Sequence, residues 1–132
     1  MTKLEIGLPG TNDARGCTGA LVRPRVVVTA EACLASTVHP DPAAASGLPI
    51  TARFPSGARI RVVDVRSGVA PGVSAVVLAR PAQVAVAPLA VDAAASGDDL
   101  TAAGFGRTKD AWITDQPHTV AFTVQQSDSA GL

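Results

Sequence analysis

Prolines and glycines interrupt this chain so often that they leave little room for long helices. Ten prolines and twelve glycines are spread over its 132 residues. The segments between them are short and rich in valine, isoleucine and threonine, and several alternate apolar with polar residues, which is typical of strands. We expect extended segments at residues 26–29, 50–54, 58–65, 75–78, 84–89, 100–106 and 119–124. Such regular short strands between turns predict an all-β barrel or sandwich.

The length allows one domain with a real core, and we expect a single domain over residues 1–132. Hydrophobic residues make up 47% of the chain but aromatic residues only 3%, so alanine and valine are expected to fill the core. A short helix at 90–96 is the one helical alternative. Residues 125–132 are polar, and we expect them to fray or to begin a strand that is not finished.

Charge and hydropathy exclude some classes of partner. Eleven basic and eleven acidic side chains cancel, so there is no positive excess to attract a nucleic acid. No stretch of apolar residues is long enough to span a membrane. The first ten residues lack the apolar core of a signal peptide, which leaves a cytoplasmic protein or one whose leader has been removed. No cofactor motif is present, so none is expected.

Two cysteines, Cys17 and Cys33, allow one disulfide bridge. It would close in an oxidising compartment and stay reduced in the cytosol. A structural bridge is the expectation, because nothing nearby in the sequence marks a reactive thiolate.

The segments around these cysteines resemble the first barrel of trypsin-like (chymotrypsin-fold) serine proteases. CTGALV at 17–22 and VVVTAEACL at 26–34 match a family strand that runs into VLTAAHC, with its two cysteines bridged. Residues 62–66, 74–82 and 102–108 resemble later family motifs in the same order. The resemblance covers about residues 15–124 and implies a trypsin-like antiparallel β-barrel, the first barrel plus the start of the second. GFGRTKD followed by Trp112 is similar to actinobacterial secreted proteins of this family, which implies secretion.

The departures from the family pattern fall on the catalytic triad. The family histidine precedes the second cysteine, and Ala32 occupies that position. The family aspartate position is taken by Val73, or by Gly72 if one residue is skipped. The serine motif GDSGGP does not occur, and residues 127–131 (SDSAG) are only a faint echo of it. We therefore expect a degenerate, truncated family member that does not hydrolyse peptides by the family mechanism.

Three residues are candidates for other proton chemistry. Glu31 is adjacent to the lost histidine position, and a buried carboxylate there would act as a general base. On an extended backbone its side chain would point away from that of Ala32, and a solvated loop carboxylate is the alternative. Asp64 lies in an alternating strand, where a surface pair with a nearby arginine is the alternative. His39, near Asp41, would more simply be a loop histidine.

The remaining candidates concern ligands. Trp112 and Phe105 follow or form the GFG turn and would stack on a ligand, or else cap the barrel rim. His39 and His118 are the only histidines and lack the spacing of a zinc site, so no metal is expected.

Three functions remain open. The chain is an inactive pseudoprotease barrel that binds a protein or peptide partner or serves as a scaffold. Alternatively, it is a small enzyme repurposed to cyclise or isomerise an apolar small molecule, with a carboxylate in its pocket. The third reading is a fragment of a longer secreted serine endopeptidase. Unfinished strand edges would also allow a homodimer.

Overall fold

The computed structural model describes residues 1–7, 14–34, 49–106 and 116–126. The chain forms two compact units, residues 1–87 and residues 88–132. The second unit begins after the last strand of the first. The expectation of one domain over residues 1–132 stays a prediction.

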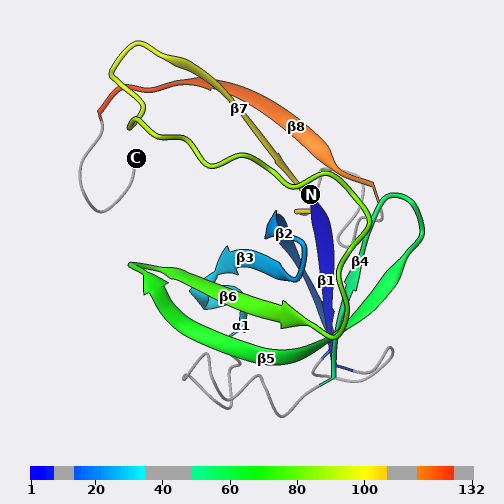
Figure 1. The fold of residues 1–132 in the computed structure, drawn as a ribbon. Helices are drawn as coiled ribbons and strands as arrows, with labels where there is room; N and C mark the ends of the chain where they lie inside the picture. The colour runs from blue at the N-terminus through cyan, green and yellow to red at the C-terminus, as the bar shows by residue number, and fades with distance from the viewer. Residues whose placement is uncertain (8–13, 35–48, 107–115, 127–132) are drawn as a thin grey trace. The chain divides into compact units, whose positions relative to one another are not determined.

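The first unit is a closed six-stranded barrel in the order β1-β2-β3-β6-β5-β4 (Figure 1). All neighbouring strands are antiparallel. The strands are β1 (Thr2–Ile6), β2 (Arg15–Arg23), β3 (Val26–Ala30), β4 (Ile50–Arg53), β5 (Arg59–Ala70) and β6 (Val73–Leu78). The predicted all-β antiparallel barrel is therefore confirmed.

Alternation along the strands decides which side chains enter the barrel. In β4, Ile50 and Ala52 are buried, while Thr51 and Arg53 lie outward. The core also takes Leu4, Ile6, Leu21, Val27, Leu34, Phe54, Ile60, Val76 and Leu78. Seven of the buried hydrophobic side chains are leucine or isoleucine and seven are alanine or valine, so alanine and valine share the core with larger aliphatic residues. The few large aliphatic side chains are concentrated on the inner face.

Gly19 permits a close approach between two strands. It lies opposite Thr29 in the β2–β3 pair. A β-carbon at this position would overlap Cγ1 of Val27 and lie 3.3 Å from the carbonyl oxygen of Val28. The barrel therefore requires a residue without a side chain here.

Several elements differ from the sequence-based expectations. Strand β1 was not predicted, although it closes the barrel by pairing with both β2 and β4. A single helical turn, α1 (Glu31–Leu34), follows β3 where an extended or tight-turn backbone was expected. Strand β5 runs to Ala70, beyond its expected end. Residues 84–89 form no strand and residues 90–96 form no helix.

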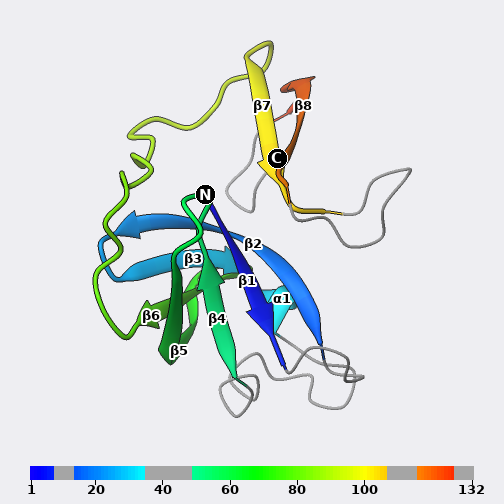
Figure 2. The same cartoon turned by 90° about the vertical axis from the view of Figure 1, so that its right-hand side faces the viewer.

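The second unit contains a two-stranded antiparallel ribbon of β7 (Asp99–Gly104) and β8 (His118–Thr123) (Figure 2). Leu100 pairs with Phe122 and Ala102 with Val120, so these four share one face. Every residue of β8 is exposed. In the described part of the chain, no helix is long and apolar enough to cross a membrane.

Candidate functional site

The end of β3 and the start of β6 form one corner of the barrel. Ala30 pairs with Val73 in the β3–β6 ladder. The backbone N–H of Glu31 donates a 2.8 Å hydrogen bond to the carbonyl oxygen of Gly72. Because Ala32 is the second residue of α1, the corner holds the residues predicted at the histidine and aspartate positions of the triad.

A tight turn at residues 71–72 brings the β5–β6 connection to this corner. Pro71 fixes its own φ, and Gly72 has a φ of 71°, the combination that a type II turn requires. Ala70 and Val73 pair across the turn. The turn directs the Gly72 carbonyl toward α1, so local sequence chemistry positions the corner.

Few side chains at this corner can carry out chemistry. Ala32 is exposed and has no proton acceptor, and Glu31 is half-buried. Because the two residues lie on a helical turn, their side chains are separated by about 100°. The expectation that they point in opposite directions was wrong, since it assumed an extended backbone.

Two hydroxyl groups lie deeper behind the corner. Thr29 Oγ1 donates a 2.8 Å hydrogen bond to the carbonyl oxygen of Thr18, which ties β3 to β2. Ser74 pairs with Thr29 across the β3–β6 ladder. The Ser74 Oγ is buried and has no hydrogen-bond partner among the described residues. It occupies a buried position in a strand and not the exposed turn that a nucleophilic serine needs.

A disulfide joins Cys17 to Cys33, with a Cα–Cα distance of 6.1 Å. It anchors α1 to β2, and the predicted pairing is confirmed. Arg15 reinforces the same connection, because its Nη2 donates a 3.1 Å hydrogen bond to the carbonyl oxygen of Leu34. The Leu34 side chain is fully buried. The backbone of the corner is thus held by one covalent bond, one buried side chain and several hydrogen bonds.

The other predicted candidates do not gather at this corner. Asp64 lies on β5 and accepts a 2.8 Å hydrogen bond from Nε of Arg66. Its other oxygen accepts from the backbone N–H of Val65. This is the surface pair given as the alternative for Asp64. Phe105 is half-buried just after β7, and His118 begins β8. His39 and Trp112 lie outside the described residues.

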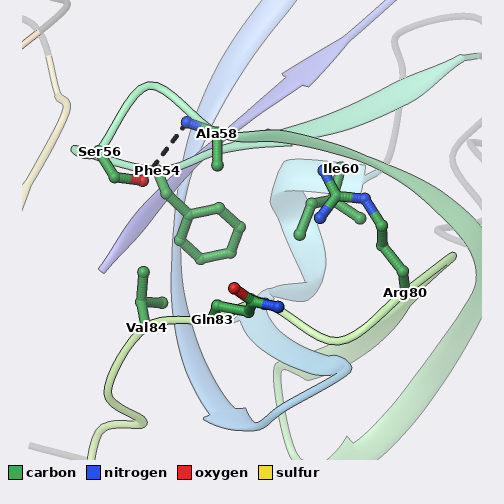
Figure 3. Close-up of a pocket in the computed structure, with 8 residues that line it drawn as sticks. Phe54, Ser56, Ala58, Ile60, Arg80, Gln83 and Val84 are labelled. Atoms are coloured by element: carbon green, nitrogen blue, oxygen red, sulfur yellow. Dashed lines mark hydrogen bonds between the residues drawn. The ribbon is translucent and has the colours of Figure 1, made fainter.

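A pocket of about 310 Å³ opens at the turn between β4 and β5 (Figure 3). Its apolar lining consists of Phe54, Ala58, Ile60, Ala82 and Val84. Its polar lining consists of Ser56, Arg80 and Gln83. None of these residues is acidic, and neither Glu31 nor Asp64 lines the pocket.

This pocket was not predicted from the sequence. The sequence did contain an indication of the pocket, because Phe54 and Ile60 occupy inward positions on either side of the Pro55-Ser56-Gly57 turn. The segment 80–84, which closes the other side, carries no strand pattern. Within the described ranges no group of three histidine, cysteine, aspartate or glutamate residues is placed to hold a metal ion.

A family model for trypsin matches residues 5–131. The chain belongs to the trypsin family. Within this trypsin-family chain, the corner at α1 and the β5–β6 turn carries alanine and either glycine or valine where the sequence pattern places histidine and aspartate. A comparison with curated protein sequences returns no significant match.

Solved structures agree with the trypsin-family assignment in fold. A structure of GrC is 21% identical with a TM-score of 0.68, and the match covers 95% of this chain and 60% of GrC. Kallikrein-related peptidase 10 in complex with Zn²⁺ is 19% identical with a TM-score of 0.64, covering 94% and 57%. Human heparin binding protein is 20% identical with a TM-score of 0.62, covering 94% and 60%. The trypsin-family chain therefore spans about three-fifths of the length of these structures.

Proposed function

We propose that this trypsin-family domain does not hydrolyse peptide bonds and acts as a binding or scaffold module. The observation that carries the proposal is Ala32. A serine hydroxyl is a weak nucleophile at neutral pH and needs a base within hydrogen-bonding distance. The methyl group of Ala32 accepts no proton, and neither Gly72 nor Val73 would orient an imidazole.

The intact backbone at the same corner supports a role for the fold itself. The Glu31–Gly72 hydrogen bond, the Ala30–Val73 pairing and the Cys17–Cys33 bridge all hold this region in place. A barrel that keeps its architecture without its catalytic groups still offers a rigid surface for a partner.

The two alternative functions have less support. A serine endopeptidase would need a histidine at position 32, and no residue outside 1–132 alters that side chain. A repurposed enzyme would need a carboxylate in a pocket, and the pocket at the β4–β5 turn is lined by none. Glu31, half-buried at the corner, is the residue through which such an enzyme would act.

The test is a hydrolysis assay of the protein at its natural length, against fluorescent casein and a panel of peptidyl amides. We expect no turnover above the buffer rate, and the same result for the Glu31→Gln variant. Turnover that disappears in Glu31→Gln would overturn the proposal and place catalysis at Glu31. Turnover that persists in Glu31→Gln would overturn the proposal and place catalysis elsewhere in the protein.

The partner that we propose is a protein or peptide, with an apolar small molecule as the alternative. A nucleic acid is disfavoured by the balanced charge. A second copy of the chain remains a further candidate, because β7 and β8 pair only with each other in the described part of the chain and each leaves a strand edge without a ladder.

A further inference from the structure

The pocket at the β4–β5 turn has a buried apolar floor. Phe54 and Ile60 are 3% and 2% exposed and belong to the barrel core, as does Ala82. Figure 3 shows the Phe54 ring facing Gln83 and Val84, with Ala58 above it. A volume of about 310 Å³ is at the small end of the range for ligand sites. It suits one large apolar side chain.

Arg80 places a positive charge at the rim of this pocket. Its Nη2 reaches the carbonyl oxygen of Arg59 at 3.4 Å, a long and therefore weak hydrogen bond. No carboxylate within the described residues pairs with it. The guanidinium is exposed and free to bind an incoming anion.

More arginines lie on the outer face of β4 and β5 beside Arg80. Arg53 pairs with Arg59, and Thr51 with Arg61, so the three arginines share that face. Ala79 donates a 2.8 Å backbone hydrogen bond to the carbonyl oxygen of Arg61, which brings the start of the 80–84 segment to the same strand.

Within the described ranges, the carboxylate of Glu5 pairs with two arginines on this face. Glu5 lies 3.0 Å from Arg59 and 3.5 Å from Arg53. Arg61 makes no ion pair in the part of the chain that the structure describes. Arg61 and Arg80 are therefore two guanidinium groups without a carboxylate partner among the described residues, although the whole chain is neutral.

From these observations we infer that this end of the barrel binds an acidic peptide segment of a partner protein. One apolar side chain of that segment enters the pocket, and its acidic neighbours pair with Arg80 and Arg61. The inference rests on the proposed binding function and names its partner class. Charge complementarity selects an acidic peptide, and the apolar floor selects a peptide with an aromatic or large aliphatic anchor.

The site is separate from the degenerate catalytic corner. Strand β6 begins at the corner with Val73 and ends with Leu78, just before Arg80. At about 3.3 Å per residue, the two ends of this strand are separated by about 17–20 Å. Peptide binding at the pocket is therefore independent of any chemistry at Glu31.

The experiment measures binding of a short fluorescein-labelled peptide, a central phenylalanine flanked by glutamates, by fluorescence anisotropy at low and at physiological salt. We expect binding that weakens as salt rises, and amide shifts at Phe54, Ala58 and Ile60 in an NMR titration. Replacing the peptide's phenylalanine by serine should weaken binding about tenfold, from the loss of one buried aromatic side chain.

Two matched protein variants separate the site from general charge attraction. Arg80→Gln should weaken binding about two- to fivefold, the range for an exposed ion pair. Arg66→Gln removes the same charge from β5, at a residue already paired with Asp64 and outside the pocket lining, and should leave the affinity unchanged. Equal losses in the two variants would overturn the proposal.

Three further results would also overturn the inference. The first is that the peptide does not bind at low salt. The second is that the NMR titration shows no amide shifts at the pocket residues. The third is that dextran sulfate binds more tightly than the peptide and that peptide affinity does not depend on its phenylalanine. The last would indicate a polyanion surface. The hydrolysis assay is a separate readout, so turnover with intact peptide binding would reject only the proposed lack of catalysis. Failure of the peptide without turnover would reject only this inference.

Discussion

Two strands of this chain have almost the same sequence pattern but differ in how far their side chains are buried. Strand β4 reads Ile-Thr-Ala-Arg, and β7 contains Leu-Thr-Ala-Ala at residues 100–103. In β4, Ile50 and Ala52 are almost completely buried. In β7, Leu100 is only half-buried and Ala102 is exposed. Alternation fixes which side chains share a face, but it does not decide whether that face is covered.

The closure of the six-stranded barrel accounts for the difference in burial between β4 and β7. The six barrel strands face one another across a common interior, so each inward side chain meets others from the opposite wall. The β7–β8 ribbon is a single layer, and a two-stranded hairpin alone is marginally stable. Its Val120 and Phe122 are 62% and 41% exposed. The folding energy of this chain is therefore expected to come mainly from the barrel.

The largest expected effect is that of a cavity in the barrel. Leu78→Ala, at a side chain with no exposed surface, should lower the free energy of unfolding by about 2–5 kcal/mol. Phe122→Ala in the ribbon should change it by no more than about 0.5 kcal/mol. Urea denaturation followed by far-UV circular dichroism measures both. Equal losses would mean that the ribbon packs as firmly as the barrel, and the contrast would fail.

Loss of the disulfide should have the next largest effect and should be confined to the barrel. Cys17 and Cys33 are separated by 16 positions, and closing a loop of that size is worth about 3 kcal/mol. Hydrogen exchange of the Cys17→Ala/Cys33→Ala variant should accelerate in β2, β3 and α1. Exchange in β7 and β8 should match the wild type. Parallel acceleration in the ribbon would show that the two units unfold together.

A glycine pair gives the smallest and most local comparison. Gly19→Ala introduces a β-carbon that overlaps Val27, and it should cost about 1–3 kcal/mol through overpacking. A β-carbon at Gly106, in the second unit, meets no atom within 4 Å, so Gly106→Ala should be nearly neutral. Thermal unfolding of the two variants checks the difference. A neutral Gly19→Ala would show that β2 and β3 can move apart without loss.

Local sequence was sufficient for the elements with a strong pattern. Residues 26–29 and 119–124 were expected as strands, and β3 and β8 cover nearly the same residues. The cysteine spacing and the TAEAC stretch located the corner and the bridge. The extended segments expected at 50–54 and 58–65 correspond to β4 and to the first half of β5, because alternation is a local pattern.

Features that depend on distant residues were missed. Strand β1 is only five residues long, and its role becomes visible when it pairs with β4, about fifty residues later. The turn α1 has four residues, too few for a helical period to appear. The pocket needs both a hairpin and the irregular segment 80–84. No local sequence pattern predicts that the β4–β5 hairpin and segment 80–84 lie next to each other.

The exposure of Ala32 has a consequence for descent. A change at this position is expected to leave the packing of the barrel untouched, whereas a β-carbon at Gly19 would overlap the side chain of Val27. Selection for folding alone would therefore retain glycine at position 19 and would allow substitutions at position 32. In a lineage of such barrels, tightly packed glycines and bridged cysteines are therefore expected to persist longer than an exposed residue such as Ala32.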